Sequence, residues 1–317
     1  MTAIPTARNR PGRRGLVLAL ALLRACRPRQ WLKNLLVFAA PATAGALADP
    51  RAVLLCLATF GLFCLASAGT YLLNDVRDAR HDRRHPRKRH RPIASGELPV
   101  PIAVVMGVLA VLVAPVASLV LGNGALSALI AGYVLLTLLY TCFLKTMVVV
   151  DLVAVASCHV LRAMAGGIVV GVVLTSWFMI VVSLAALLVV VGKREAELRA
   201  TGTPEPVGEA DLGEEDGTHP TRAALLGYTT DYLSRMRTVA SGAMIVTYCL
   251  WALEQGGGPQ SVFHAVSIVP FVMFVLRYNL LVDRGSGEEP EEIALKDRPL
   301  QATLLSLVLL IGLGIHL

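Results

Sequence analysis

The sequence predicts an all-α membrane protein in which nine transmembrane helices surround a polar cavity that faces the cytoplasm. Of its 317 residues, 55% are hydrophobic and only 16% are charged, and the mean hydropathy is +0.65. A soluble domain is about 45–50% apolar and about 25% charged, so this chain has too few charges to cover a soluble protein. The apolar residues also come in long blocks, and a helix needs about 20 such residues to cross a bilayer.

Nine apolar blocks are long enough to be transmembrane helices, and a short amphipathic helix at about 15–27 precedes them. The predicted spans are 32–48, 52–73, 100–122, 125–144, 147–172, 175–192, 238–255, 262–282 and 300–316. We therefore divide the chain into a basic N-terminal segment, 1–27, and one transmembrane domain, 28–317. Within this domain, the acidic, Gly- and Pro-rich stretch at about 199–224 is expected to be a mobile cytoplasmic loop.

The basic residues predict the orientation in the membrane. Of 29 Lys and Arg residues, 26 lie before or at the very start of the first span and in every second connection after it. Such a bias marks the cytoplasmic side. We therefore expect the N-terminus and the segments 74–99, 193–237 and 283–299 to be cytoplasmic, and the C-terminus to be outside. No cleavable signal peptide is apparent, so a multi-pass protein of the cell (inner or plasma) membrane is expected.

The net charge of +7 is explained by this topology and by attraction to anionic membrane lipids. The basic runs lack interleaved aromatic residues, so nucleic-acid binding is not expected. The six cysteines show no metal-ligand spacing and are interpreted as small apolar residues.

A stripe of oxygen-bearing side chains follows the second span. Asn74, Asp78 and Asp82 are spaced four residues apart, so on a continuing helix they share one face, with Asp75 at its edge. Mg²⁺ prefers such oxygen ligands and completes its shell with water and substrate phosphates. The alternative is an acidic cap that only balances the neighbouring arginines.

A basic loop comes directly after this stripe, with Arg83, Lys88 and Arg91 among its cations and prolines that break the helix. Alone, this loop would be a lipid-binding or orienting patch. Beside a magnesium site it would form a second binding region for a substrate with several phosphates, because the guanidinium group of arginine donates paired hydrogen bonds to phosphate oxygens.

Further charged and polar residues lie at the cytoplasmic ends of other spans. Arg162 lies deep in the fifth span, on nearly the same face as Asp151, and an intramembrane charge indicates a functional site or a structural ion pair. The other candidates for substrate binding are Lys33, Tyr140, Lys145, Lys193, Arg194 and Glu197.

The run from Asn74 to Asp82 resembles the first aspartate-rich motif of the UbiA superfamily of intramembrane prenyltransferases. The wider pattern resembles its decaprenyl-phosphate phosphoribosyltransferase branch. The stretches that carry this resemblance are 27–41, 71–96, 161–167, 192–198 and 289–301. The chain departs from quinone-type members after the sixth span, where their second acidic motif is replaced by Lys193 and Arg194.

The resemblance implies a reaction of 5-phosphoribosyl 1-diphosphate with a polyprenyl phosphate, which releases diphosphate and serves cell-wall arabinan synthesis. It implies Mg²⁺ on Asn74, Asp78 and Asp82, cations that hold the phosphates, and Tyr140 and Asp151 beside the ribose. A transferase of prenyl diphosphate to an aromatic acceptor, and a lipid-phosphate transporter, are the alternatives. Small residues such as Gly166 also allow a homo-oligomer.

Overall fold

The computed structural model of the protein describes residues 11–86, 88–121, 124–200, 223–255, 258–285, 293 and 295–316. Eight of the described helices are long and apolar enough to cross a membrane. They are α3 (Pro50–Asp82), α4 (Val100–Ser118), α5 (Gly124–Cys142), α6 (Val150–Val170), α7 (Ser176–Ala200), α9 (Thr230–Glu254), α10 (Pro259–Asp283) and α12 (Arg298–His316). The described residues contain no β-strand, so the predicted all-α membrane fold is confirmed. Most of the predicted acidic loop, 199–224, lies outside the described residues.

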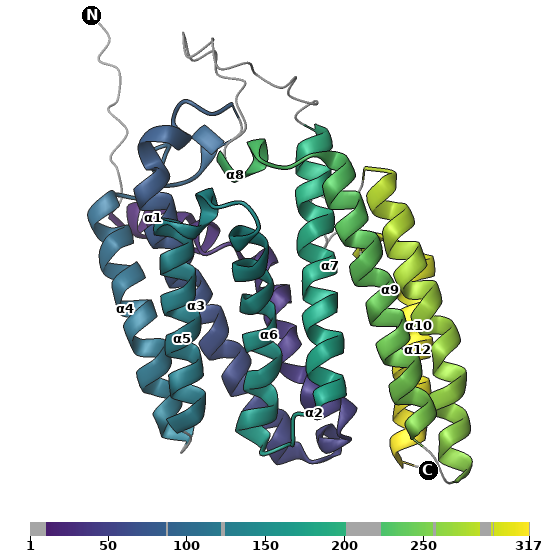
Figure 1. The fold of residues 1–317 in the computed structure, drawn as a ribbon. Coiled ribbons are helices and arrows are strands. Elements are labelled where there is room, and N and C mark those ends of the chain that lie inside the picture. Colours follow the sequence, from purple (N-terminus) through teal and green to yellow (C-terminus); the bar gives the residue numbers. More distant parts are fainter. Residues whose placement is uncertain are drawn as a thin grey trace, which may run out of the picture.

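The long helices lie side by side in one bundle (Figure 1). The short helices α1 (Pro11–Ala25) and α8 (Ala223–Leu226) lie at one end of this bundle. The five-residue helix α2 (Ala39–Thr43) and the end of α12 lie at the other. Large apolar side chains such as Leu54, Leu112 and Leu253 are exposed around the outside, as expected for surfaces that contact lipid.

The predicted first span, 32–48, is not a regular transmembrane α-helix. It forms the 3₁₀-helix η1 (Pro28–Phe38), then α2, then the short 3₁₀-helix η2 (Ala46–Ala48). A 3₁₀-helix rises about 2 Å per residue, so η1 and α2 together extend about 30 Å, the thickness of a bilayer core. The chain therefore traverses the bundle here, but the described residues contain eight regular transmembrane helices instead of the nine predicted.

Tertiary contacts hold this first segment in its irregular form. The Asn34 side chain donates to the Cys64 Sγ atom at 3.3 Å and accepts from Arg162 at 2.7 Å. The Val37 carbonyl lies directly against Gly166 of α6. An apolar run of suitable length therefore did not become an α-helix, because its backbone and polar side chains are fixed by α3 and α6.

Helix α3 is much longer than a bilayer requires. Its 33 residues extend about 50 Å, whereas the apolar core of a bilayer is about 30 Å thick. It begins at Pro50, and the Asp49 side chain accepts the Arg51 N–H at 2.9 Å as an N-cap. The helix continues through Asp82, as the spacing of the oxygen-bearing residues requires, so Asn74, Asp75 and Asp78 all lie in its last turns.

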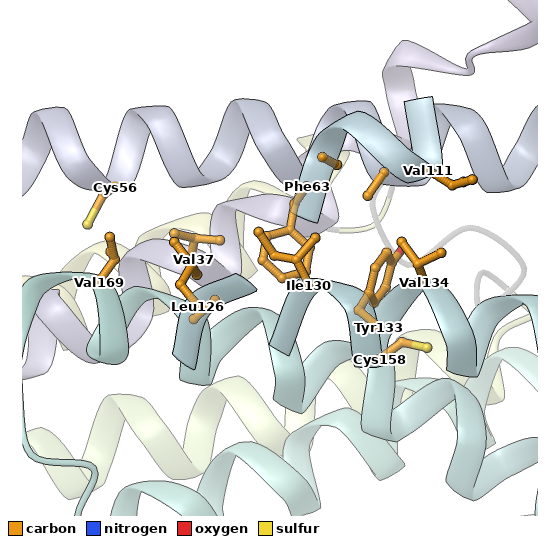
Figure 2. Packing of buried hydrophobic residues seen from close by; sticks show 13 residues of the cluster. Val37, Cys56, Phe63, Val111, Leu126, Ile130, Tyr133, Val134, Cys158 and Val169 are labelled. Carbon is orange, nitrogen blue, oxygen red and sulfur yellow. The ribbon is translucent and has the colours of Figure 1, made fainter. Parts of the chain in front are cut away.

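The apolar core of the N-terminal half ends directly beneath polar residues. Figure 2 shows Phe63 of α3 packed against Ile130 and Tyr133 of α5. The Phe63 and Tyr133 rings meet edge to face, with centroids 5.2 Å apart. The Tyr133 hydroxyl lies 3.0 Å from the Ser67 hydroxyl and accepts from Arg162, so this tyrosine joins the packed core to polar side chains.

Gly166 tests whether the contact with η1 holds the fold together. A methyl group at this position would overlap the Val37 carbonyl oxygen. We expect Gly166→Ala to lower the free energy of unfolding by about 1–3 kcal/mol or more, measured by thermal unfolding in detergent. Gly242→Ala in α9 is the matched control, because nothing lies within 4 Å of its new methyl group. Equal stability of the two variants would contradict this description of the packing.

Candidate functional site

Four transmembrane helices bring most of the predicted site residues to the end of the bundle near α1 and α8 (Figure 1). Helix α3 contributes Asn74 and Asp78, and α5 contributes Tyr140. Asp151 lies in the first turn of helix α6, and the last turns of α7 carry Lys193 to Glu197. The short 3₁₀-helix η5 (Leu144–Thr146), which follows α5, adds Lys145.

Asp78 forms the centre of the first polar group. The Lys145 Nζ atom lies 3.0 and 3.3 Å from its two carboxylate oxygens. Asn74 donates to the same carboxylate at 3.3 Å. Both charged side chains keep about a quarter of their surface exposed, 28% for Asp78 and 25% for Lys145. Because this ion pair is partly open to water, its members can exchange partners when a phosphate or a cation enters.

The remaining acids of the predicted stripe are neutralised by arginines. Asp75 is 2% exposed and binds Arg27 at 2.5 Å and Arg91 at 3.3 Å. Arg91 also binds Asp82 at 2.7 Å. The guanidinium of Arg27 lies 5.1 Å from the centre of the Tyr71 ring. Arg91 of the basic loop therefore connects two turns of α3. Arg27 is a site residue that was not predicted from the sequence.

Arg194 is the centre of the second polar group. It donates to Asp151 at 2.9 Å, Glu197 at 2.8 Å and the Tyr140 hydroxyl at 3.0 Å. Its side chain is 3% exposed. Helices α5, α6 and α7 are therefore joined by one buried guanidinium. Three residues that were predicted to bind substrate, Tyr140, Asp151 and Glu197, all bind this cation.

Tyr228, which follows α8, contacts this polar group through Asp151. Its hydroxyl donates to Asp151 at 2.5 Å and accepts the backbone N–H of Val149 at 2.6 Å. Val149 has φ of +67°, a strained conformation for a β-branched residue. Burial and the hydrogen bond to Asp151 raise the pKa of the Tyr228 phenol, so the hydroxyl stays protonated and donates. Tyr228 is a single tyrosine after an acidic segment, and nothing in this sequence context predicts its role.

Arg162 forms a deeper polar group. Its guanidinium donates to Asn34 at 2.7 Å, to the Tyr133 hydroxyl at 2.8 Å and to the Cys158 carbonyl at 2.8 Å. It also lies 4.8 Å from the centre of the Tyr133 ring. Tyr133 lies two helical turns, about 10 Å, from Tyr140 along α5. Arg162 is 4% exposed, and within the described part of the chain no carboxylate pairs with it.

The other predicted cations lie around these groups. Lys33 donates to Gln30 at 2.6 Å, and Lys193 is half-buried near the end of α7. Arg83 donates to the Ala94 carbonyl at 3.2 Å and is otherwise exposed. Lys88 is half-buried, and its backbone N–H donates to His85 at 3.3 Å. The basic loop is thus ordered by its own hydrogen bonds at the rim of the site.

Asn74 and Asp78 are the residues that fit a divalent metal ion. Their side chains are adjacent on α3, and Mg²⁺ binds through one or two carboxylates together with water and phosphates. Asp82 lies eight residues from Asn74, about 12 Å along the helix, and is held by Arg91. No cluster of three His, Cys, Asp or Glu residues suited to a metal occurs among the described residues. Of the three predicted ligands, Asn74 and Asp78 therefore lie side by side, whereas Asp82 pairs with Arg91.

Comparison with known proteins gives consistent results. Residues 35–193 match the UbiA prenyltransferase family. A decaprenyl-phosphate phosphoribosyltransferase of Corynebacterium glutamicum is 38% identical over 305 residues, which cover 95% of this chain and 88% of the relative. The protein of that name from Mycobacterium tuberculosis is 39% identical, with 94% of this chain and 95% of the relative covered.

Solved structures share the fold. A UbiA homolog from Archaeoglobus fulgidus bound to DMAPP and Mg²⁺ superimposes with a TM-score of 0.66 at 17% identity. The match covers 92% of this chain and 97% of that chain. At this level of identity the likeness concerns the arrangement of the helices.

Tyr228→Phe tests the contact that closes the second polar group. The variant loses the donor to Asp151 and the acceptor for the strained Val149 N–H, so we expect the free energy of unfolding to fall by about 1–3 kcal/mol. Tyr232→Phe is the control, because Tyr232 stacks on Tyr228 with centroids 6.0 Å apart and is 38% exposed. Thermal unfolding of both purified variants provides the measurement; a Tyr228→Phe protein as stable as the control would refute this role.

Proposed function

Since the chain belongs to the UbiA prenyltransferase family, we propose that it transfers 5-phosphoribose from 5-phosphoribosyl 1-diphosphate to decaprenyl phosphate or a similar polyprenyl phosphate. Diphosphate is the other product. The observation that carries the proposal is the similarity, at 38% and 39% identity and over nearly the whole chain, to two proteins named for this activity. The site brings acids on α3 together with cations on η5, α6 and α7, which suits substrates with several phosphates.

The chemistry needs charge stabilisation more than proton transfer. Loss of diphosphate leaves positive charge on the anomeric carbon, as in glycosyl transfer. The lipid phosphate is already ionised near neutral pH, so it attacks without a general base. The described site accordingly centres on Asp, Lys and Arg side chains, while His85 at its rim accepts a backbone hydrogen bond. Burial and then the nearby Lys88 lower the pKa of His85, which keeps it uncharged.

Asn74 and Asp78 would hold Mg²⁺ in this proposal. The bound ion would supply charge neutralisation to the departing diphosphate. Lys145, whose pair with Asp78 is partly exposed, is then available to a substrate phosphate. Arg194 keeps Asp151, Tyr140 and Glu197 in place around the ribose.

Arg162 is assigned to the 5-phosphate of the donor. The diphosphate and the 5-phosphate are attached to opposite ends of the ribose. Tyr140, which is proposed to lie beside the ribose, is about 10 Å along α5 from Tyr133, which binds Arg162. A phosphate at Arg162 would also neutralise a buried cation that has only uncharged partners in the described protein. Lys33 and Lys193 add positive charge near His159, one turn before Arg162 on α6.

We also propose that the protein spans the cell membrane with this site at the cytoplasmic face. The basic segments 74–99 and 193–237 contain most of the candidate site residues, and such segments stay in the cytoplasm. A water-soluble phosphorylated sugar would enter from that side, and the lipid phosphate would reach the same end of the bundle from the bilayer.

A transfer assay with variants tests the proposal. Purified full-length protein with 5-phosphoribosyl 1-diphosphate, polyprenyl phosphate and Mg²⁺ should release diphosphate and form a phosphoribosylated lipid, detected by mass spectrometry. We expect Asp78→Ala to reduce kcat/KM by about 100-fold or more. The matched control is Asp231→Ala, which removes an exposed acid paired with Arg235 at 2.8 Å.

Two results would overturn the assignment. Transfer of a prenyl group from its diphosphate to an aromatic acceptor, without use of the phosphoribosyl donor, would indicate the other transferase class. Normal turnover of the Asp78→Ala protein would remove the metal site from α3.

A further inference from the structure

Helix α1 is apolar but too short to cross a bilayer. It has 15 residues and extends about 22 Å, whereas the apolar core of a bilayer is about 30 Å thick. Four arginines precede Gly15 in the sequence, and no acidic residue occurs before Asp49. A short apolar helix with arginines beside it is typical of a helix that lies in the surface of a membrane.

One face of α1 packs against the bundle and holds the helix in place. Ala21 and Ala25 are 0% and 1% exposed, and they belong to a buried cluster with residues of α3 and α4. At the side of the helix, Arg24 forms an ion pair with Glu97, in the loop before α4. The rotation of α1 about its own axis is therefore set by its buried face and by this ion pair.

The opposite face of α1 is apolar and exposed. Leu16, Leu20 and Leu23 are 62%, 50% and 50% exposed. Successive residues of an α-helix are about 100° apart, so these three leucines lie within about 60° of one another. They form a stripe on the side away from Ala21 and Ala25. A continuous apolar stripe on the surface indicates that something else contacts it.

The contacts of α1 place this leucine stripe at the surface of the bilayer. The buried cluster of α1 includes Ala103, which lies in the first turn of the membrane-spanning helix α4. Figure 1 shows α1 at the end of the bundle where α4 begins. The first turn of a transmembrane helix lies at the edge of the apolar core. Interfacial helices bury their apolar face about 5–10 Å into this edge, which matches the position of α1.

We propose that α1 is an interfacial helix whose leucine stripe inserts into the lipid leaflet at the site end of the bundle. The arginines that precede the stripe complement the anionic headgroups of such a leaflet. The acidic stretch at about 199–224 contains few large apolar residues, so it does not complement three exposed leucines. This attachment to lipid is independent of the proposed reaction.

Insertion of α1 would hold a segment of the candidate site at the membrane surface. Arg27 follows the end of α1 after one residue and pairs with Asp75. The Trp31 Nε1 atom donates to the carbonyl of Cys26, the residue between α1 and Arg27, at 3.0 Å. The leaflet therefore supports the short connection that carries this arginine.

A fluorescent amino acid at position 20 tests this proposal without any measurement of transfer. The naphthyl amino acid Anap replaces Leu20 in the full-length protein, which is placed in nanodiscs of phosphatidylcholine and phosphatidylglycerol. One quencher is a phosphatidylcholine with a doxyl spin label near its headgroup, and the other is acrylamide in the water. The quantity measured is the ratio of lipid quenching to acrylamide quenching. Because Leu20 is exposed, the replacement leaves the packed face of α1 intact.

Two matched positions calibrate this ratio. Position 105 is the lipid-facing reference, because Val105 in the second turn of α4 is 57% exposed. Position 235 is the water-facing reference, because Arg235 of α9 is charged and its side chain is 79% exposed. We expect the ratio at position 20 to be similar to that at position 105 and several-fold higher than that at position 235.

Two results would overturn the proposal. A ratio at position 20 equal to that at position 235 would mean that the leucine stripe faces water. Failure of both quenchers to reach position 20 would mean that protein covers the stripe, either another part of this chain or a second copy of it.

Discussion

The guanidinium of Arg162 lies inside the apolar bundle, bonded to Asn34, Tyr133 and a carbonyl of its own helix. Burying a charge costs several kcal/mol unless partners compensate for the lost water. Here the compensation comes from three segments that are far apart in the sequence, so η1, α5 and α6 are bound together at one point. The irregular course of η1 and the position of the Tyr133 ring over the core both follow from this requirement.

Exposure divides the charges around the site into fixed and exchangeable ones. Arg194 and Asp151 are almost completely buried, and breaking such a pair costs about 3–5 kcal/mol. They therefore form a fixed ion pair. The Tyr228 hydroxyl connects this pair to the strained Val149, because it donates to Asp151 and accepts the Val149 N–H. The pair of Asp78 and Lys145 is partly open to water, and such pairs contribute little to stability. Asp78 can therefore exchange Lys145 for a metal ion, and Lys145 can exchange Asp78 for a phosphate.

Local sequence patterns predicted most of the transmembrane helices and several site residues of this protein. The remaining features depend on contacts between residues that are distant in the sequence. Apolar block lengths located eight transmembrane helices, and four-residue spacing aligned Asn74 with Asp78 on α3. The interpretation of 32–48 as a regular helix was wrong, because the contact of Val37 with Gly166 is invisible in a local pattern. Asp82 was expected to join Asn74 and Asp78, but Arg91 from the following loop binds it. Tyr228 and Arg27 were missed for the same reason, since their partners are distant in sequence.

Binding of ribose 5-phosphate to the purified protein tests the assignment of Arg162 most directly, because this ligand carries the 5-phosphate and lacks the diphosphate. Calorimetry should show affinity that falls about tenfold or more in Arg162→Gln and remains in Arg235→Gln, a change on the exposed surface of α9. Melting temperatures of both variants establish that they are folded. Equal affinity of a folded Arg162→Gln protein and wild type would contradict the view that this buried cation is a phosphate receptor.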